Sequence, residues 1–410
     1  MKRLIPFLVL LPVLLGCGRQ ESARPPGAVY QDISHPRVWK VVPFSQAESL
    51  GLVTGDLVIA YDGKPVSTND EIRNAQAMAL GSREPIPVVL LRRNQEVVVG
   101  ARPGPLGVMP VSARHPSSLA LALQDAMTQF GMFTDYDWLA ALTGESFTFT
   151  ARADVCRAWW PGGKARVYLD EVARAAGLKL ERVRGTDDPA AATDAIRGEL
   201  LRGRVVLVEG GWPDYRRDFW GIARRFDQES GRVYGLTMDA SAEQPLVGPV
   251  QGAWVVSRAG DWVEPEKLVR QVLVQALELA QVRSGEGWLS GIEAWDQLIV
   301  SLESIPFCPV CGELGSQDCL DRLVWATVAH KESANRFLEW MRLALPDQAP
   351  VIDDLIAGNS AIIGKLEGLA RSGTKLGRLA DQQKIARLFG DVQLIEAEQV
   401  GRYEELIGAL

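Results

Sequence analysis

The chain has 410 residues, of which 47% are hydrophobic and 23% charged, and its formal net charge at pH 7 is −7. This length predicts about two or three domains, and the composition is that of a globular protein. The acidic balance, without a basic block, argues against nucleic-acid binding, because phosphate contacts need clustered Lys and Arg. His35, His115 and His330 stand far apart, so a multi-histidine metal site or a Ser-His or Cys-His enzyme is hard to assemble.

Residues 1–16 are expected to be a secretory signal. Lys2 and Arg3 precede an apolar run from Leu4 to Leu15, which is too short to span a bilayer core about 30 Å thick. The run closes on Leu14-Leu15-Gly16-Cys17, which resembles the lipobox of bacterial lipoproteins. The resemblance implies cleavage before Cys17 and its acylation. An ordinary signal peptide with an incidental cysteine and a short signal anchor are the alternatives.

The residues after Cys17 bear on the destination and on the spacing from the membrane. No Asp follows Cys17, so the lipoprotein resemblance implies the outer membrane, with the chain facing the periplasm. Residues 17–29 contain Pro25 and Pro26 among polar residues and are expected to form a tether.

Residues 30–110 show a short-strand pattern with one longer helix. We expect strands at about 38–42, 57–61, 87–91 and 96–99 and a helix at about 69–80. Asp62-Gly63 suits a tight hairpin turn, because Gly tolerates positive φ. The segment Gly51–Val66 carries the spacing G-L-x-x-G-D, then D-G-x-P-V, and resembles the core of bacterial PDZ domains. The PDZ resemblance implies a β-barrel-like module that binds peptides or protein C-termini at a sheet edge.

The PDZ resemblance also implies where a peptide would bind. Leu106-Gly107-Val108 has the apolar-Gly-apolar form of a loop whose N–H groups hold a carboxylate, and it stands at the end of the module, as in circularly permuted PDZ domains. Ile72 and Ala79 would then face the ligand from the groove helix. In the alternative, residues 106–108 are only a linker strand.

Residues 115–260 have helices first and antiparallel strands later, which is an α+β order. Ser117 and Ser118 open an amphipathic helix that ends at Gly131. Strand patterns at about 205–208, 220–226, 233–239 and 253–256 predict a meander. This order resembles papain-like cysteine peptidases of the bacteriocin-processing type and the N-terminal domains of butirosin-type acyltransferases.

The residues that the papain-like families use for catalysis are replaced in this chain. Those families place a Cys at the start of the first helix, and a His at the start of a strand, oriented by an Asp or Asn on the next strand. Here the helix start has Ser117 and Ser118, the strand start has Phe219-Trp220, and only Asp239 matches. We therefore expect no catalysis. The alternative is a hydrolase or acyltransferase that uses Ser117 or Ser118 with Asp239.

Residues 261–410 are expected to be helical. A helix pattern begins at Glu264-Pro265, and further patterns cover about 287–303, 317–345, 350–371, 374–389 and 391–409. Cys308, Cys311 and Cys319 form a C-x-x-C pair with a third cysteine nearby. In an exported chain a disulfide is the favoured interpretation, and a zinc site, which needs four ligands, is the alternative. Apart from this zinc, no cofactor is expected.

The combined prediction is a multidomain α+β lipoprotein of the cell envelope. Its PDZ module would bind protein or peptide C-termini, its papain-like domain would be a pseudoenzyme, and its lipid would contact the membrane. A third hypothesis, which requires neither peptide binding nor catalysis, is a zinc- or disulfide-linked structural scaffold of the cell envelope.

Overall fold

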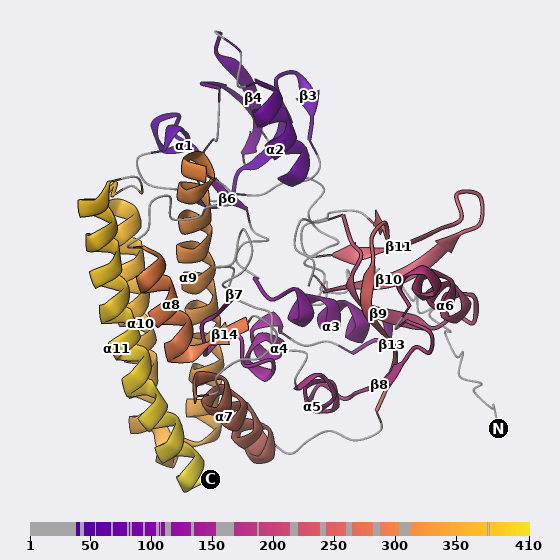
Figure 1. Ribbon diagram of the computed structural model, residues 1–410, viewed down its shortest axis with the longest axis vertical. Helices are drawn as coiled ribbons and strands as arrows, with labels where there is room; N and C mark the ends of the chain where they lie inside the picture. Colours follow the sequence, from indigo (N-terminus) through magenta and orange to yellow (C-terminus); the bar gives the residue numbers. More distant parts are fainter. Residues whose placement is uncertain are drawn as a thin grey trace, which may run out of the picture.

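The computed structural model is described over residues 38–410, except 42–44, 54, 67–68, 80–81, 83, 93–94, 104–105, 107, 111–115, 133–134, 153–167, 187, 214–219, 238–242, 260–264, 282–287, 303–311, 375 and 377. It is an α+β structure with two larger antiparallel sheets, of four and six strands, and a C-terminal region of long helices (Figure 1). The predicted α+β class is confirmed at this level. Among the described residues, no helix has both the length and the apolar character needed to cross a membrane.

The N-terminal module has its own sheet and its own core. Its elements are β1 (Val38–Val41), α1 (Gln46–Ser49), β2 (Leu57–Tyr61), β3 (Lys64–Pro65), α2 (Asn69–Met78), β4 (Ile86–Arg92), β5 (Gln95–Ala101) and β6 (Val108–Pro110). The four-stranded sheet has the order β3-β2-β4-β5, and β1 pairs with β6. Asp62 and Gly63 have φ values of 53° and 71°, as the predicted hairpin turn requires. The strand positions expected for residues 30–110 are confirmed.

The six-stranded sheet follows in the chain. Its elements and the helices around it are α3 (Ser118–Gln129), α4 (Tyr136–Leu142), β7 (Thr150–Arg152), α5 (Leu169–Ala175), β8 (Leu178–Arg182), α6 (Pro189–Leu201), β9 (Val205–Gly210), β10 (Trp220–Asp227), β11 (Arg232–Thr237), β12 (Gln244–Pro245) and β13 (Val250–Arg258). The strand order is β12-β11-β10-β9-β13-β8. The predicted simple meander is wrong in one respect, because β13 crosses back to pair with β9 rather than extending the sheet beyond β11.

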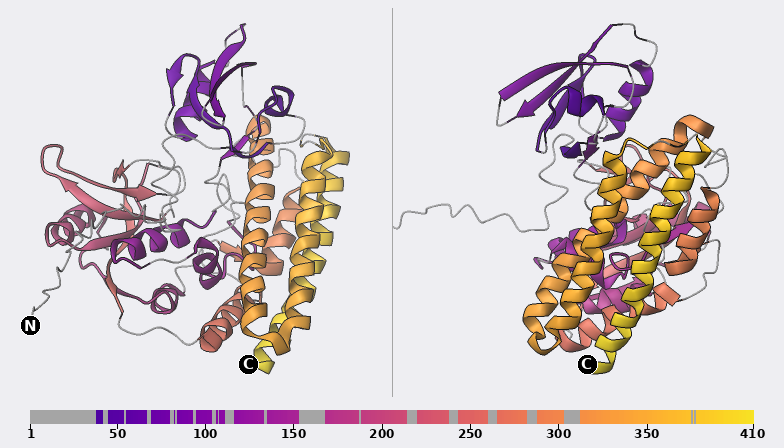
Figure 2. Two further views of the ribbon diagram at one scale, coloured as in Figure 1. Left: turned by 180° about the vertical axis from the view of Figure 1, so that it is seen from behind. Right: turned by 90° about the vertical axis from the view of Figure 1, so that its left-hand side faces the viewer.

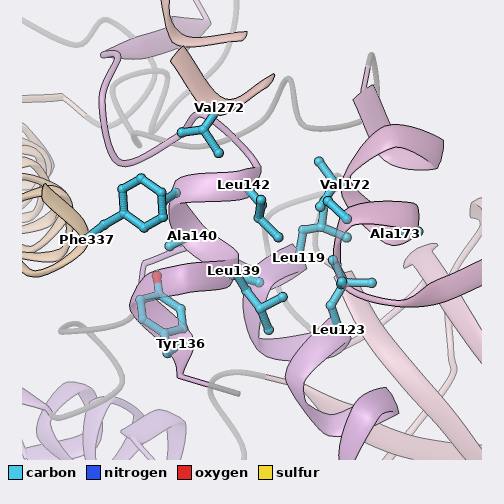
Figure 3. Close-up of a cluster of buried hydrophobic side chains, with 14 of the residues drawn as sticks. Leu119, Leu123, Tyr136, Leu139, Ala140, Leu142, Val172, Ala173, Val272 and Phe337 are labelled. Carbon is cyan, nitrogen blue, oxygen red and sulfur yellow. The ribbon is translucent and has the colours of Figure 1, made fainter. Parts of the chain in front are cut away.

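Helices cover both faces of the six-stranded sheet. On one face, α3 packs along β10, and its apolar side chains meet those of α4, α5 and α7 in a continuous core (Figure 3). On the other face, Ala192 and Ile196 of α6 pack against Val206 and Val208 of β9. Every residue of α3 from Leu119 to Met127 is buried, which is typical of a helix enclosed on all sides.

The C-terminal helices differ from the predicted segments in two places. The elements are α7 (Pro265–Gln281), β14 (Trp288–Ser290), α8 (Gly291–Ser301), α9 (Gly312–Ala344), η4 (Pro346–Gln348), α10 (Ala349–Arg371) and α11 (Leu379–Ala409). Residues 288–290 form a strand paired with β7 instead of a helical turn. The two helices predicted at 374–389 and 391–409 are one helix, because Gly390 continues the helical backbone between buried Phe389 and Val392.

Helix α9 belongs to two cores at once. Its residues Leu320 to Val328 contribute to a cluster with α8, α10 and α11, centred on Trp295, which is fully buried. Phe337 and Met341, farther along, belong to the core that contains α3 and α4. Figure 2 shows α10 and α11 on the outer side of this helical region, away from the six-stranded sheet.

Candidate functional site

The loop before β6 is fixed to the rest of the N-terminal module. The Leu106 carbonyl accepts a hydrogen bond from the backbone N–H of Ala47 at 2.8 Å. The Leu106 side chain is 1% exposed and lies in the core of the module. Gly107 lies outside the described residues. Val108 begins β6 and pairs with Val41 in antiparallel register. The position of β6 is therefore fixed on one side of Gly107 by Leu106, which packs in the core, and on the other by Val108, which pairs with β1.

The two other residues predicted to contact a peptide are Ile72, in helix α2, and Ala79, which directly follows the end of α2. Ile72 and Ala79 are seven residues apart, a spacing that the sequence analysis read as one helix face. Their exposed fractions are 6% and 7%, and both belong to the core of the module. Most of each side chain is therefore used in packing, and a peptide on this face would meet only the remainder.

Asp56, from the Gly55-Asp56 pair of the sequence motif, has a structural role within the N-terminal module. Asp56 is 1% exposed and accepts two hydrogen bonds from Arg92, at 2.7 and 2.6 Å, and one from the Val53 N–H at 2.9 Å. Burial raises the pKa of Asp56, but these hydrogen bonds and the Arg92 charge outweigh burial and leave the pKa below its usual value. Arg92 also donates to the Gly51 carbonyl at 2.8 Å. Sequence reasoning missed Arg92, because nothing local links two residues 36 positions apart.

Ser117 is used as a helix cap. Its Oγ accepts a hydrogen bond from the Ala120 N–H at 3.1 Å, and its own N–H donates to the Tyr136 hydroxyl at 2.9 Å. Ser117 is 1% exposed. These contacts satisfy the first turn of α3, as a serine N-cap does.

Ser118 joins the start of α3 to the start of β10. The Trp220 N–H donates a hydrogen bond to Ser118 Oγ at 3.2 Å. The helix start and the strand start that the sequence analysis selected are therefore neighbours. Trp220 is 4% exposed, and the centroid of its ring lies 5.3 Å from that of Trp254.

A buried carboxylate beside this contact and a second one two turns farther along α3 were missed by sequence reasoning. Glu209 of β9 stands directly opposite Trp220 in the ladder and is 5% exposed. Asp125, seven residues after Ser118 on α3, is 3% exposed, and its Oδ2 has no hydrogen-bond partner in the described part of the chain. Burial raises the pKa of Asp125 to about 6, with Arg224 lowering it and Glu243 raising it. A carboxylate that directly follows the apolar run Leu119–Leu123 and Gln124 was the signal that could have found Asp125.

The remaining predicted site residues are only partly covered by the structure. Of these, Cys17, Asp239, Cys308 and Cys311 lie outside the described residues, as do two residues that were not predicted to form a site, His115 and Cys156. Cys319 lies in the first part of α9. Among the described residues, no group of three or more His, Cys, Asp or Glu side chains could hold a metal ion. The zinc and disulfide hypotheses therefore stay predictions. His330, the histidine of the C-terminal region, is 3% exposed within α9.

Ser117 and Ser118 supply the two hydroxyls that the sequence analysis found at the helix start. The two hydroxyls accept backbone hydrogen bonds, and an indole occupies the strand start where a histidine base was sought. Comparison of the chain with protein-family models and with curated proteins finds no match.

Proposed function

We propose that this chain is a lipid-anchored protein of the cell envelope that faces the periplasm, most simply from the outer membrane. Its N-terminal module is a PDZ domain that binds peptides or the C-termini of partner proteins. The following domain has a papain-like fold and performs no covalent chemistry.

The observation that carries the proposal is the position of β6. This strand pairs antiparallel with β1 along one edge, and within the described residues no strand lies along its other edge. An edge with unpaired N–H and C=O groups accepts an extended peptide as an added strand. Leu106-Gly107 directly precedes β6, so N–H groups of that loop would meet a C-terminal carboxylate at the end of the added strand.

Peptide titration followed by fluorescence anisotropy tests this function. Peptides ending in an apolar residue should bind the full-length chain with Kd on the order of micromolar. Amidation of the C-terminus and Gly107→Glu should each abolish binding, because the first removes the anion and the second places a charge against it. Val98→Glu is the matched control, since Val98 is 65% exposed on the outer strand β5. Equal affinity for acid and amide peptides would contradict carboxylate capture.

The non-catalytic part of the proposal rests on the contacts of Ser117 and Ser118. A serine nucleophile needs a base within about 2.6–3.2 Å. Ser117 Oγ caps α3, and Ser118 Oγ accepts a hydrogen bond from the Trp220 N–H. Serine- and thiol-directed probes should leave Ser117, Ser118 and Cys156 unlabelled in the folded chain. Stoichiometric serine labelling that disappears in Asp239→Asn would instead establish the hydrolase or acyltransferase alternative.

The anchor is tested separately. Cys17→Ser should release the chain from membranes or leave the signal uncleaved, as judged by fractionation and mass spectrometry of the mature N-terminus. A Cys17→Ser chain that is processed and stays membrane-bound would contradict lipidation without affecting the peptide-binding result.

A further inference from the structure

The four-stranded sheet of the N-terminal module has one long edge without protection. Strand β5 is the last in the order β3-β2-β4-β5, and within the described residues no strand pairs with its outer side. Its seven residues include three consecutive valines and one charged side chain, and no proline. The register between β5 and β4 is unbroken, so no bulge turns this edge aside. Such an edge is a template for another strand.

The other edges of the two larger sheets have features that discourage pairing. Strands β3 and β12 have only two residues each, and the second of each is a proline. Strand β8, at the opposite edge of the six-stranded sheet from β12, has three charged residues among five. Short strands, prolines and charges are the usual protections of sheet edges. Among the described edges of these two sheets, β5 is the exception, which indicates a role in pairing.

Three residues of β5 direct their backbone N–H and C=O groups to the outer side. The Pro87 carbonyl accepts a hydrogen bond from the Asp62 N–H at 2.9 Å, on the β2 side, so Pro87 and Gly100 are a pair of the β4–β5 ladder without hydrogen bonds. Hydrogen-bonded and non-hydrogen-bonded pairs alternate along an antiparallel ladder. The backbone groups of Glu96, Val98 and Gly100 therefore point away from β4.

The side chain of Gln46 ends this row of outward-pointing groups. The Arg102 N–H donates a hydrogen bond to Gln46 Oε1 at 2.8 Å, and Gln46 Nε2 donates one to the Arg102 carbonyl at 3.1 Å. The Gln46 amide thus takes the place of a neighbouring strand at Arg102. At the other end, β5 begins at Gln95. The outward-pointing groups of β5 are therefore centred on Val98, whose side chain is 65% exposed.

We propose that the β5 edge is an interface between two copies of this chain, which pair antiparallel about a two-fold axis at Val98. Val98 then stands opposite Val98, and Glu96 of each copy stands opposite Gly100 of the other, so the outward N–H and C=O groups of all three residues are hydrogen-bonded. The two four-stranded sheets become one sheet of eight strands. The second copy's β5 begins at Gln95, so the ladder ends where Gln46 supplies the next partner.

Charge complementarity favours a second copy over an unrelated strand. Glu96 and Arg102 are exposed and lie on the same face of the strand as Val98. Neither side chain forms an ion pair in the part of the chain that the structure describes. In the two-fold pairing, Glu96 stands diagonally across from Arg102 of the second copy, a spacing that long side chains bridge. The axis repeats this contact, so both carboxylates gain a cation.

Sedimentation velocity of the full-length chain tests the interface. The wild-type chain should dimerise with Kd on the order of 100 μM, because a single pair of strands makes a small contact. Val98→Lys should weaken the dimer at least about tenfold, because it places two like charges directly opposite each other. Met78→Lys is the matched control, since Met78 is an apolar side chain of the same module that is 69% exposed on α2.

A proline variant tests the hydrogen bonds separately from the side chains. Val98→Pro removes an N–H that β4 does not use, so the β4–β5 ladder should stay and the dimer should weaken at least about tenfold. Val98→Thr keeps this N–H and should dimerise like the wild type. Circular dichroism checks that each variant is folded, and Val98→Lys decides the matter if proline unfolds the module.

The peptide titration proposed above is separate from this test. At its micromolar chain concentrations the dimer is dissociated, so Val98→Glu remains a valid control there. A chain that dimerises but binds no peptide would contradict the peptide-binding function alone, and a chain that binds peptide but stays monomeric would contradict the β5 interface alone.

A charge-reversal pair tests the register. Glu96→Lys should weaken the dimer at least about threefold, and Glu96→Lys/Arg102→Glu should restore it, because each copy then offers the reversed partner. A wild-type chain that is monomeric at about 300 μM, or a dimer indifferent to Val98→Lys and Val98→Pro, overturns the interface and leaves this edge to a strand of another protein. Failure of the double reversal to restore a dimer weakened by Glu96→Lys overturns the two-fold register.

Discussion

Lys331 of α9 and Glu396 of α11 form a buried ion pair with 2.5 Å between Nζ and Oε1. Their side chains are 2% and 7% exposed. Lys331 Nζ also donates a hydrogen bond to the Phe147 carbonyl at 2.8 Å. Phe147 follows α4, so one ammonium group links the segment after α4 to α9 and α11. The nearby Tyr403 hydroxyl has its pKa raised, first by burial and then by the Glu396 charge.

Removing one partner of this ion pair should destabilise the chain strongly. Lys331→Met leaves a buried carboxylate without its cation, and we expect the free energy of unfolding to fall by about 3–5 kcal/mol. Lys331→Met/Glu396→Leu should recover most of the loss, because no buried charge remains. Urea unfolding measures both. Lys365→Met, which removes a surface pair with Asp391, should cost less than about 1 kcal/mol. Equal losses for the two single variants would contradict this prediction.

The Asp56–Arg92 pair should make the N-terminal module sensitive to acid. The pKa of Asp56 is lower in the folded chain than the unfolded value of 3.8. Its stabilising contribution is therefore fully present above the unfolded pKa and is lost as the pH falls through the folded pKa. Asp56→Asn should lower module stability by about 2 kcal/mol at pH 7 and remove this acid sensitivity. Hydrogen exchange of β2 and β4 measures the effect.

Arg92→Lys is the control for geometry at the same pair. Lysine keeps the positive charge but cannot make the two parallel hydrogen bonds of a guanidinium group. We expect the stability of the Arg92→Lys module to lie between that of the wild type and that of Asp56→Asn. A lysine variant as stable as the wild type would show that charge alone, and not the paired hydrogen bonds, holds the turn.

Asp125 should have the opposite pH dependence. Its folded pKa of about 6 lies above the ordinary aspartate value of 3.8, so the folded chain binds the proton more tightly than the unfolded chain. Stability therefore falls as the pH rises between these two values and stays lower above them. Asp125→Asn should raise the free energy of unfolding by up to about 3 kcal/mol at pH 8 and change it little at pH 4.

Unfolding titrations at several pH values measure the Asp125 effect. The exposed Asp170 provides a control, because Asp170→Asn alters a surface carboxylate and should change stability by less than about 0.5 kcal/mol. An Asp125→Asn chain that is less stable than the wild type at pH 8 would mean that the carboxylate makes a stabilising contact.

Ser117 should act through structure alone. Ser117→Ala removes the N-cap of α3 and is expected to lower the free energy of unfolding by about 1 kcal/mol. Ser118→Ala leaves the Trp220 N–H without its acceptor and should cost about 1–3 kcal/mol. Thermal unfolding measures both losses. A loss of a measurable hydrolase activity in either variant, without a loss of stability, would point to a catalytic hydroxyl.

The sequence by itself determined the local structure of this protein. The positive φ values of Asp62 and Gly63 are those that a two-residue hairpin turn requires. Helix α3 begins after the Ser117 cap and ends before Gly131, as these residue types predict. Such features depend on neighbours within a few residues, so they can be recognised in the chain. For the same reason the sequence pointed to Ser118 and Trp220 as the starts of a helix and a strand.

The tertiary structure decided which distant residues meet. Trp220 contacts Ser118 across 102 positions, and Lys331 reaches Phe147 across 184. The return of β13 to pair with β9 and the continuity of α11 through Gly390 also depend on packing that no local pattern records. The pKa values of the buried carboxyls Asp56 and Asp125 are shifted by burial and by charged groups that only folding brings near, because desolvation acts on the assembled core.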